Sequence, residues 1–219
     1  MSSNRNGAKP CAWPRTEIFR PADYFTGLTE VLSNLPVGRV EQICDALLRA
    51  YDDGRRIFLF GNGGSASLAS HFACDLGKGT TARCNHARRF RAIALTDNIP
   101  MMTAWANDSA YEDIFVEQLR NLIEADDLVL AISASGNSPN VLRALEAAGE
   151  AGGFRIGLTG FQGGKMKKLC ELCLIVPSDN MQLIEDVHLS VAHAVFTTIR
   201  HELEGRAAGA DLKVASAAR

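Results

Sequence analysis

Two loops rich in glycine, serine and asparagine carry the residues whose chemistry is easiest to infer. Each loop follows an apolar run and precedes a helix-like segment; they read Gly61-Asn62-Gly63-Gly64-Ser65 and Ser133-Ala134-Ser135-Gly136-Asn137-Ser138. Glycines let backbone N–H groups converge on an anion, and the next helix N-terminus adds its dipole. We therefore expect the loops to hold a phosphorylated small molecule through Asn62, Gly63, Gly64, Ser65, Ser133, Ala134, Ser135 and Ser138.

Neither loop belongs to a common nucleotide-binding type. No Gly-Lys-Ser/Thr follows either of them, which excludes a P-loop, and the full GxGxxG pattern of dinucleotide sites is absent. Neither motif therefore identifies the phosphorylated ligand as a nucleotide.

A histidine and a carboxylate follow the first loop. His71 and Asp75 are four residues apart, so a helix puts them on one face with about 5–6 Å between their Cβ atoms. Such a pair suits a metal ion or an acid–base couple, and the alternative is a helical histidine capped by a neighbouring carboxylate. Its place directly after a phosphate-type loop favours the functional interpretation.

Two further regions hold candidate polar residues. In the final helix, Glu185 and His193 are eight residues apart, about 80° from perfect alignment, so both can flank a site without defining its geometry. His188 lies between them among apolar neighbours typical of a helix core. Asp108 could hold sugar hydroxyls or could equally cap the next helix. Cys170 and Cys173 have CxxC spacing, and we interpret them as two partly buried thiols.

Short apolar strands alternate with helical segments over most of the chain. This pattern predicts an α/β fold with a doubly wound, mostly parallel sheet and helices on both faces. We expect a flexible N-terminus at 1–20, N-terminal helices at 21–52, the α/β domain at 53–204 and a flexible tail at 205–219. Within the domain the expected strands are 56–60, 91–95, 127–132, 155–159 and 174–176, and the expected helices are 65–76, 99–106, 113–122, 139–151, 164–170 and 181–203.

Bulk properties exclude several classes of function. A formal net charge of −2 argues against a nucleic-acid surface. No apolar run approaches the roughly 18 residues that a membrane span needs. The polar N-terminus has no signal-peptide core, so we expect a cytoplasmic protein.

Together these motifs resemble the sugar isomerase (SIS) domain. Besides the two loops, the resemblance includes Leu158-Thr159-Gly160 followed by Gly163-Gly164-Lys165. A narrower resemblance, to sedoheptulose 7-phosphate isomerases (phosphoheptose isomerases), is carried by His71-Phe72-Ala73, Trp105-Ala106-Asn107-Asp108, Ile184-Glu185-Asp186-Val187-His188 and His193. It extends over residues 24–203, most of the chain.

The resemblance implies a homotetramer with an active site at a subunit interface and one zinc ion per subunit. By motif position the zinc ligands are His71, Asp75, Glu185 and His193, with Asp75 and His193 as catalytic candidates and Glu185 also near the substrate. It favours His193 over His188 as a functional residue. Asp75 and Glu185 replace the Glu and Gln of the family pattern, and Lys78-Gly79 stands where an Arg is expected.

The expected reaction is the conversion of sedoheptulose 7-phosphate to D-glycero-D-manno-heptose 7-phosphate through a metal-assisted enediol mechanism. One alternative is an isomerase of another phosphorylated sugar, suggested by the replacements at Asp75 and Glu185. Another is a non-catalytic tetramer that binds the bacterial replication initiator, a role in which relatives have lost the metal residues.

Overall fold

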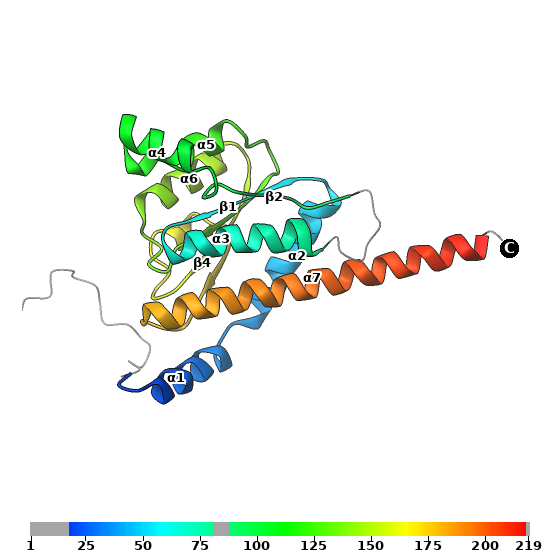
Figure 1. The fold of residues 1–219 in the computed structure, drawn as a ribbon, viewed down its shortest axis with the longest axis horizontal. Coiled ribbons are helices and arrows are strands. Elements are labelled where there is room, and N and C mark those ends of the chain that lie inside the picture. The colour runs from blue at the N-terminus through cyan, green and yellow to red at the C-terminus, as the bar shows by residue number, and fades with distance from the viewer. Residues whose placement is uncertain (1–17, 81–87, 218–219) are drawn as a thin grey trace, which may run out of the picture.

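Five parallel strands form the centre of the molecule. The computed structural model describes residues 18–80 and 88–217, and its strands are paired in the order β2-β1-β3-β4-β5 (Figure 1). Their bounds are Arg56–Gly61 (β1), Arg91–Ala94 (β2), Leu128–Ile132 (β3), Phe154–Thr159 (β4) and Leu172–Ile175 (β5). All five expected strands are present, and the parallel sheet is confirmed.

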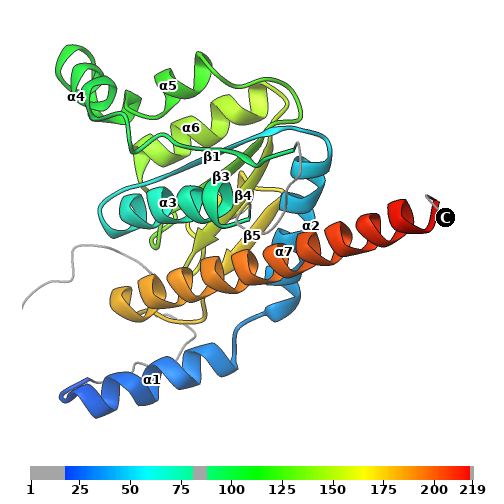
Figure 2. The same ribbon diagram turned by 45° about the vertical axis from the view of Figure 1, so that its right-hand side comes forward.

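Helices cover both faces of this sheet, as expected for a doubly wound fold (Figure 2). Alternate strand residues point to opposite faces. Leu59 and Leu130 pack with α2 (Val37–Asp52), α3 (Gly64–Cys74) and α7 (Met181–Ala217). Phe58 and Val129 pack with α5 (Val116–Arg120) and α6 (Pro139–Glu150). Because both faces are buried, the strands are apolar throughout.

The strand order creates a topological switch point between β1 and β3. From β1 the chain turns to β2 on one side and then crosses to β3 on the other. The two strands end level with each other, with Gly61 paired to Ile132. Ligands of open α/β sheets bind beyond the carboxyl ends of strands at such a point. Both Ser/Gly loops begin there, so the fold brings them together as expected.

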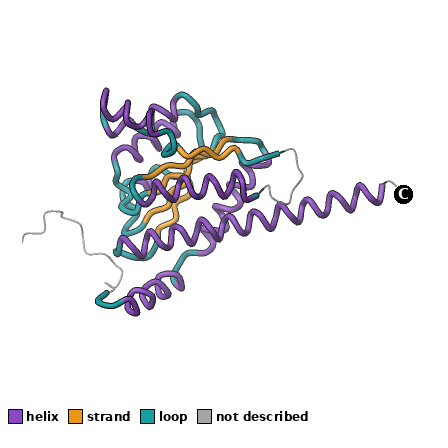
Figure 3. The backbone as a smooth tube through the Cα atoms, viewed as in Figure 1, coloured by secondary structure: helices purple, strands orange, loops and turns teal. Residues whose placement is uncertain are grey.

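The helices α1 (Pro21–Ser33) and α4 (Ile99–Asp108) lie outside the sheet layers, and the C-terminal part of α7 projects beyond them (Figures 1 and 3). The N-terminal helix α1 packs mainly along α7, and the expected N-terminal helical extension is confirmed. The helix α4 has no buried residue. Among the described residues no helix is both long and apolar enough to cross a bilayer.

Three expected helix boundaries are wrong. The final helix continues past residue 203 to Ala217, because the alanine-rich segment has high helix propensity. Arg206 also ties this extension to Asp52 at 2.9 Å and to Glu202 at 3.0 Å. The segment 113–122 splits into a 3₁₀ turn and α5, and 164–170 forms only the 3₁₀ turn Met166–Lys168. Residues 1–17 of the expected flexible N-terminus lie outside the described residues.

Candidate active site

A cavity of about 280 Å³ lies between the start of α3 and the first turns of α7. Gly64 and Ser65 of the first loop line one side, and Glu185 and His188 line the other. His71 also contributes to the wall. The first loop and the two helices chosen from the sequence therefore enclose one space.

Three of the four predicted metal ligands converge beside this cavity. The Nε2 atoms of His71 and His193 are 3.0 Å apart, and His71 Nε2 lies 3.4 Å from Asp75 Oδ2. One ligand atom from each residue lies within 4.8 Å of the other two. Both histidines are exposed, so His193 is not a packed core residue.

The donor set fits a zinc ion. Imidazole nitrogen and carboxylate oxygen are ordinary zinc ligands, and bonds of about 2.0–2.1 Å in a tetrahedron place ligand atoms about 3.3 Å apart. The separations of 3.0 and 3.4 Å are close to that value. The two imidazole nitrogens are also within hydrogen-bond distance, so in metal-free protein the Nε2–H of one ring can donate to the Nε2 of the other.

Close packing of α3 against α7 positions this cluster. After α3 the helix widens into a π-helical turn, Asp75–Gly79, whose first residue is the candidate ligand. A side chain on Gly79 would lie 2.5 Å from the ring of Phe196, which is one turn beyond His193. The glycine thus lets α7 approach. Single π-helical turns are frequent at functional sites.

Glu185 is not brought into this ligand group. Its carboxylate lies instead against the first residue of α3, because a Cβ on Gly64 would be 2.9 Å from Glu185 Oε2. A carboxylate at a helix N-terminus is favoured by the helix dipole. Glu185 therefore faces the first loop from across the cavity, where it is placed to contact a ligand.

The first loop has a backbone that only glycine adopts easily. Gly63 has φ +56°, and the next residue begins α3. Asn62, predicted as a phosphate contact, is instead held by Asn140 at the start of α6: the two amides exchange hydrogen bonds of 2.9 and 2.8 Å. Tyr111 donates to the same Asn62 oxygen at 3.1 Å. The side chain of Asn62 thus connects the loop to α6.

The second loop forms a cluster of hydroxyl groups at the N-terminus of α6. The Oγ atoms of Ser133 and Ser138 are 3.2 Å apart, and Ser135 Oγ accepts from the Asn137 N–H at 3.2 Å. The Ala134 carbonyl accepts from Thr159 Oγ1 at 3.1 Å and from the Gly160 N–H at 2.9 Å. None of these residues lines the cavity beside α7. A ligand confined to that cavity would therefore contact the first loop and not the second.

Asp108 lies away from the cavity. It is the last residue of α4, is exposed, and accepts from the Asn107 side chain at 2.7 Å. The suggested N-cap role for Asp108 is wrong, since α4 ends there and the following 3₁₀ turn begins after Ala110. Its proposed contact with sugar hydroxyls stays a prediction.

The sequence analysis did not pick out Asp186 and Tyr24, which lie near the site, and it gave His188 little weight. Asp186 lines the cavity and accepts from the Tyr24 hydroxyl of α1 at 2.6 Å. Burial and this carboxylate raise the pKa of Tyr24 to about 12. His188 is buried, and burial lowers its pKa to about 4. The sequence signal that could have pointed to Asp186 and His188 was their position next to and three residues after Glu185 on the same helix.

The CxxC pair behaves as expected for partly buried thiols. Burial, with a contribution from the neighbouring thiol, raises the pKa of Cys170 to about 12, and burial raises that of Cys173 to about 11. Reactive cysteines have lowered pKa values. These two residues therefore contribute packing around Gly157, where both sulfur atoms lie close to the backbone.

Comparison with known proteins gives a consistent relationship. The family model of the SIS domain matches residues 23–160. A phosphoheptose isomerase of Aliarcobacter butzleri is 40% identical over 165 residues, 75% of this chain and 85% of that protein. A phosphoheptose isomerase of Akkermansia muciniphila is 36% identical over 192 residues, 87% of this chain and 97% of that protein.

A solved structure extends the relationship to three dimensions. The phosphoheptose isomerase of Neisseria gonorrhoeae superposes with a TM-score of 0.75 at 31% identity, covering 81% of this chain and 95% of that one. Sequence and fold agree, and the chain therefore belongs to the phosphoheptose isomerase family of SIS-domain proteins.

Proposed function

We propose that this phosphosugar isomerase converts sedoheptulose 7-phosphate to D-glycero-D-manno-heptose 7-phosphate. The observation that carries the proposal is the convergence of His71, Asp75 and His193 beside a cavity that the first Ser/Gly loop lines. Relatives of similar length that bear the name phosphoheptose isomerase support this choice of substrate.

In this proposal His71, Asp75 and His193 hold a zinc ion. When bound, zinc would polarise the neighbouring carbonyl and hydroxyl oxygens of the sugar. Aldose–ketose isomerisation also needs a group that removes the proton next to the carbonyl and one that moves protons between the oxygens. Asp75 and His193 are the groups close enough to each other to share these tasks. A carboxylate that binds metal tightly is a weaker base, so the two roles of Asp75 compete.

The hydroxyls of the two loops provide the phosphate contacts. Ser65 lines the cavity, while Ser133, Ser135 and Ser138 surround the N-terminus of α6. That helix end carries partial positive charge, which favours an anion. Glu185, across from the first loop, contacts the sugar portion of the substrate.

We further propose a cytoplasmic homotetramer in which the helices of residues 21–52 make subunit contacts. Large apolar side chains are exposed there, with Phe25 at 65% and Val37 at 58%. A second chain would bury them and could bring the second loop or Asp108 into the cavity of its neighbour. Light scattering at micromolar concentration should give four times the chain mass, and a monomer would contradict this assembly.

A panel of ketose phosphates tests the proposed reaction. Purified protein supplied with zinc should turn over sedoheptulose 7-phosphate with the highest kcat/KM, detected as the aldose product. A higher kcat/KM for a shorter sugar would assign a different substrate to the same site. No turnover of any sugar, together with no bound metal, would favour the alternative of a non-catalytic tetramer that binds the replication initiator.

A further inference from the structure

The buried side chain of His188 has only one of its two nitrogens in a hydrogen bond. It is 1% exposed, and its Nε2 lies 3.2 Å from the carbonyl oxygen of Thr159, the last residue of β4. A carbonyl only accepts, so Nε2 carries the hydrogen and Nδ1 is left with a lone pair. No donor among the described residues reaches Nδ1.

This arrangement is a poor way to stabilise the fold. A buried polar atom without a partner costs stability, and an apolar group of similar shape avoids that cost. The Thr159 carbonyl would not be left alone without His188, because it also accepts from the Val176 N–H at 2.8 Å. The stability of the sheet edge thus gives no reason for an imidazole at this position.

The hydrogen bond does connect the two halves of the candidate site. On the sheet side, Thr159 Oγ1 donates to the carbonyl of Ala134 in the second loop at 3.1 Å. On the helix side, Glu185 lies three residues before His188 and shares its face of α7. The carboxylate of Glu185 reaches Gly64 of the first loop, and His193 one turn further on reaches His71.

We propose that His188 is a positioning residue of the isomerase site, fixing α7 to the end of β4 so that Glu185 and His193 meet the first loop and α3. The inference rests on the proposed function. It gives a reason for an imidazole at the cavity wall despite the cost of leaving Nδ1 without a partner among the described residues. A helix free to slide or turn would carry the ligand His193 away from His71 and Asp75.

Two substitutions of similar size test the role. His188→Met keeps the volume and removes the donor, whereas His188→Gln keeps an N–H near the position of Nε2. For the Met variant we expect zinc affinity, measured by competition with a chromophoric chelator, to fall about 10- to 100-fold, the effect typical of groups that orient metal ligands. Its kcat should fall while the melting temperature of the metal-free protein stays equal or rises. The Gln variant should keep most of both functions, as should a surface control on the same helix, His201→Gln.

Each other result contradicts the inference. A Met variant that melts earlier or fails to fold, or one with unchanged zinc affinity and kcat, would make His188 a packing residue. A Gln variant as defective as the Met variant would exclude the Nε2–Thr159 hydrogen bond as the cause. If the wild-type protein and the Met variant bind zinc equally well, this inference alone is overturned. If the wild-type protein binds no zinc, the proposed function is overturned as well.

Discussion

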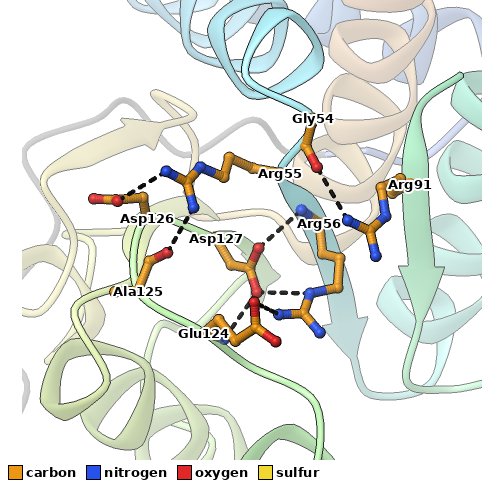
Figure 4. Close-up of polar contacts among 8 residues, drawn as sticks. All are labelled: Gly54, Arg55, Arg56, Arg91, Glu124, Ala125, Asp126 and Asp127. Atoms are coloured by element: carbon orange, nitrogen blue, oxygen red, sulfur yellow. Dashed lines mark hydrogen bonds and ion pairs between the residues drawn. The ribbon is translucent and has the colours of Figure 1, made fainter. Parts of the chain in front are cut away.

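Two clusters of titratable groups in this molecule are held in different ways. At the amino ends of β1 and β3, charged groups are paired with one another (Figure 4). Asp127 is buried and accepts from the N–H and Nε of Arg56 and from the Glu124 N–H, each at 2.9 Å. Between α7 and the helical segment that holds His71 and Asp75, these two residues and His193 gather their ligand atoms, with the two imidazole Nε2 atoms 3.0 Å apart.

This difference separates a structural network from a functional site. In the first region each carboxylate oxygen of Asp127 has donors of the same chain, so nothing more is needed to satisfy it. In the second region three potential ligand atoms lie within 4.8 Å of one another on side chains that are exposed or half-buried. The first arrangement satisfies its buried charges within the chain, whereas the second gathers potential metal-binding atoms where solvent can reach them.

Removing Asp127 should give the largest effect, and one on stability alone. Asp127→Ala removes the buried partner of Arg56, whose side chain is only 15% exposed and keeps just the ion pair with the exposed Glu124 at 2.7 Å; breaking a buried ion pair costs about 3–5 kcal/mol. Urea denaturation should show that loss, while kcat per folded chain stays at the wild-type value. If Asp127→Ala were as stable as the wild type but had a lower kcat, the assignment of this region to stability and not to function would be wrong.

The opposite outcome is expected for His193. His193→Gln removes an imidazole that can bind the metal and transfer protons, so kcat should fall at least about 100-fold. Because the side chain is exposed, the melting temperature should change little. The control is His201→Gln, an exposed histidine on the same helix that should retain wild-type kcat. Near-wild-type kcat in the His193 variant would remove this residue from the site.

Loop hydroxyls should affect binding more than chemistry. Ser65→Ala and Ser135→Ala each remove a hydrogen bond to a charged phosphate, worth about 1.5–3 kcal/mol. Since such contacts are shared by ground and transition states, KM should rise about 10- to 150-fold with kcat nearly constant. Steady-state kinetics with Ser33→Ala of α1 as the control would measure this. An unchanged KM in both loop variants would refute the phosphate assignment.

An exposed ion pair beside the Asp127 network should contribute least. Arg55 Nη2 lies 3.1 Å from Asp126 Oδ2, with the side chains 40% and 72% exposed. Arg55→Met keeps the aliphatic stem and should cost under about 1 kcal/mol in urea denaturation, because solvent screens such pairs. If Arg55→Met lost as much stability as Asp127→Ala, burial would not determine how much each ion pair of this network contributes to stability.

Much of the fold could be predicted from local patterns. Strands buried on both faces are continuous apolar runs, so segments such as Leu128–Ile132 were recognisable. The extension of α7 to Ala217 was missed because alanine-rich sequence was interpreted as a tail although it favours helix. The splitting of segment 113–122 depends on packing against α6, which no local pattern reveals.

Site residues on the same helix could be predicted to lie together from their spacing in the sequence. Contacts between residues of different helices were harder to predict. His71 and Asp75 face the same way because they are four residues apart, and the structure keeps them 3.4 Å apart. Whether Glu185 or His193 joins them depends on how α7 lies against α3. That placement rests on long-range contacts at Gly79 and Gly64, two positions without side chains. The same reason concealed the link from His188 to Thr159.

A zinc titration of metal-free protein tests the central claim most directly. Turnover of sedoheptulose 7-phosphate and bound zinc are measured on the same samples as metal is added after chelation. We predict that metal-free protein is inactive, and that turnover rises in proportion to bound zinc and saturates near one ion per chain. Full turnover without metal, or zinc bound equally well after His71→Ala and His193→Ala, would contradict a metal-dependent site at these residues.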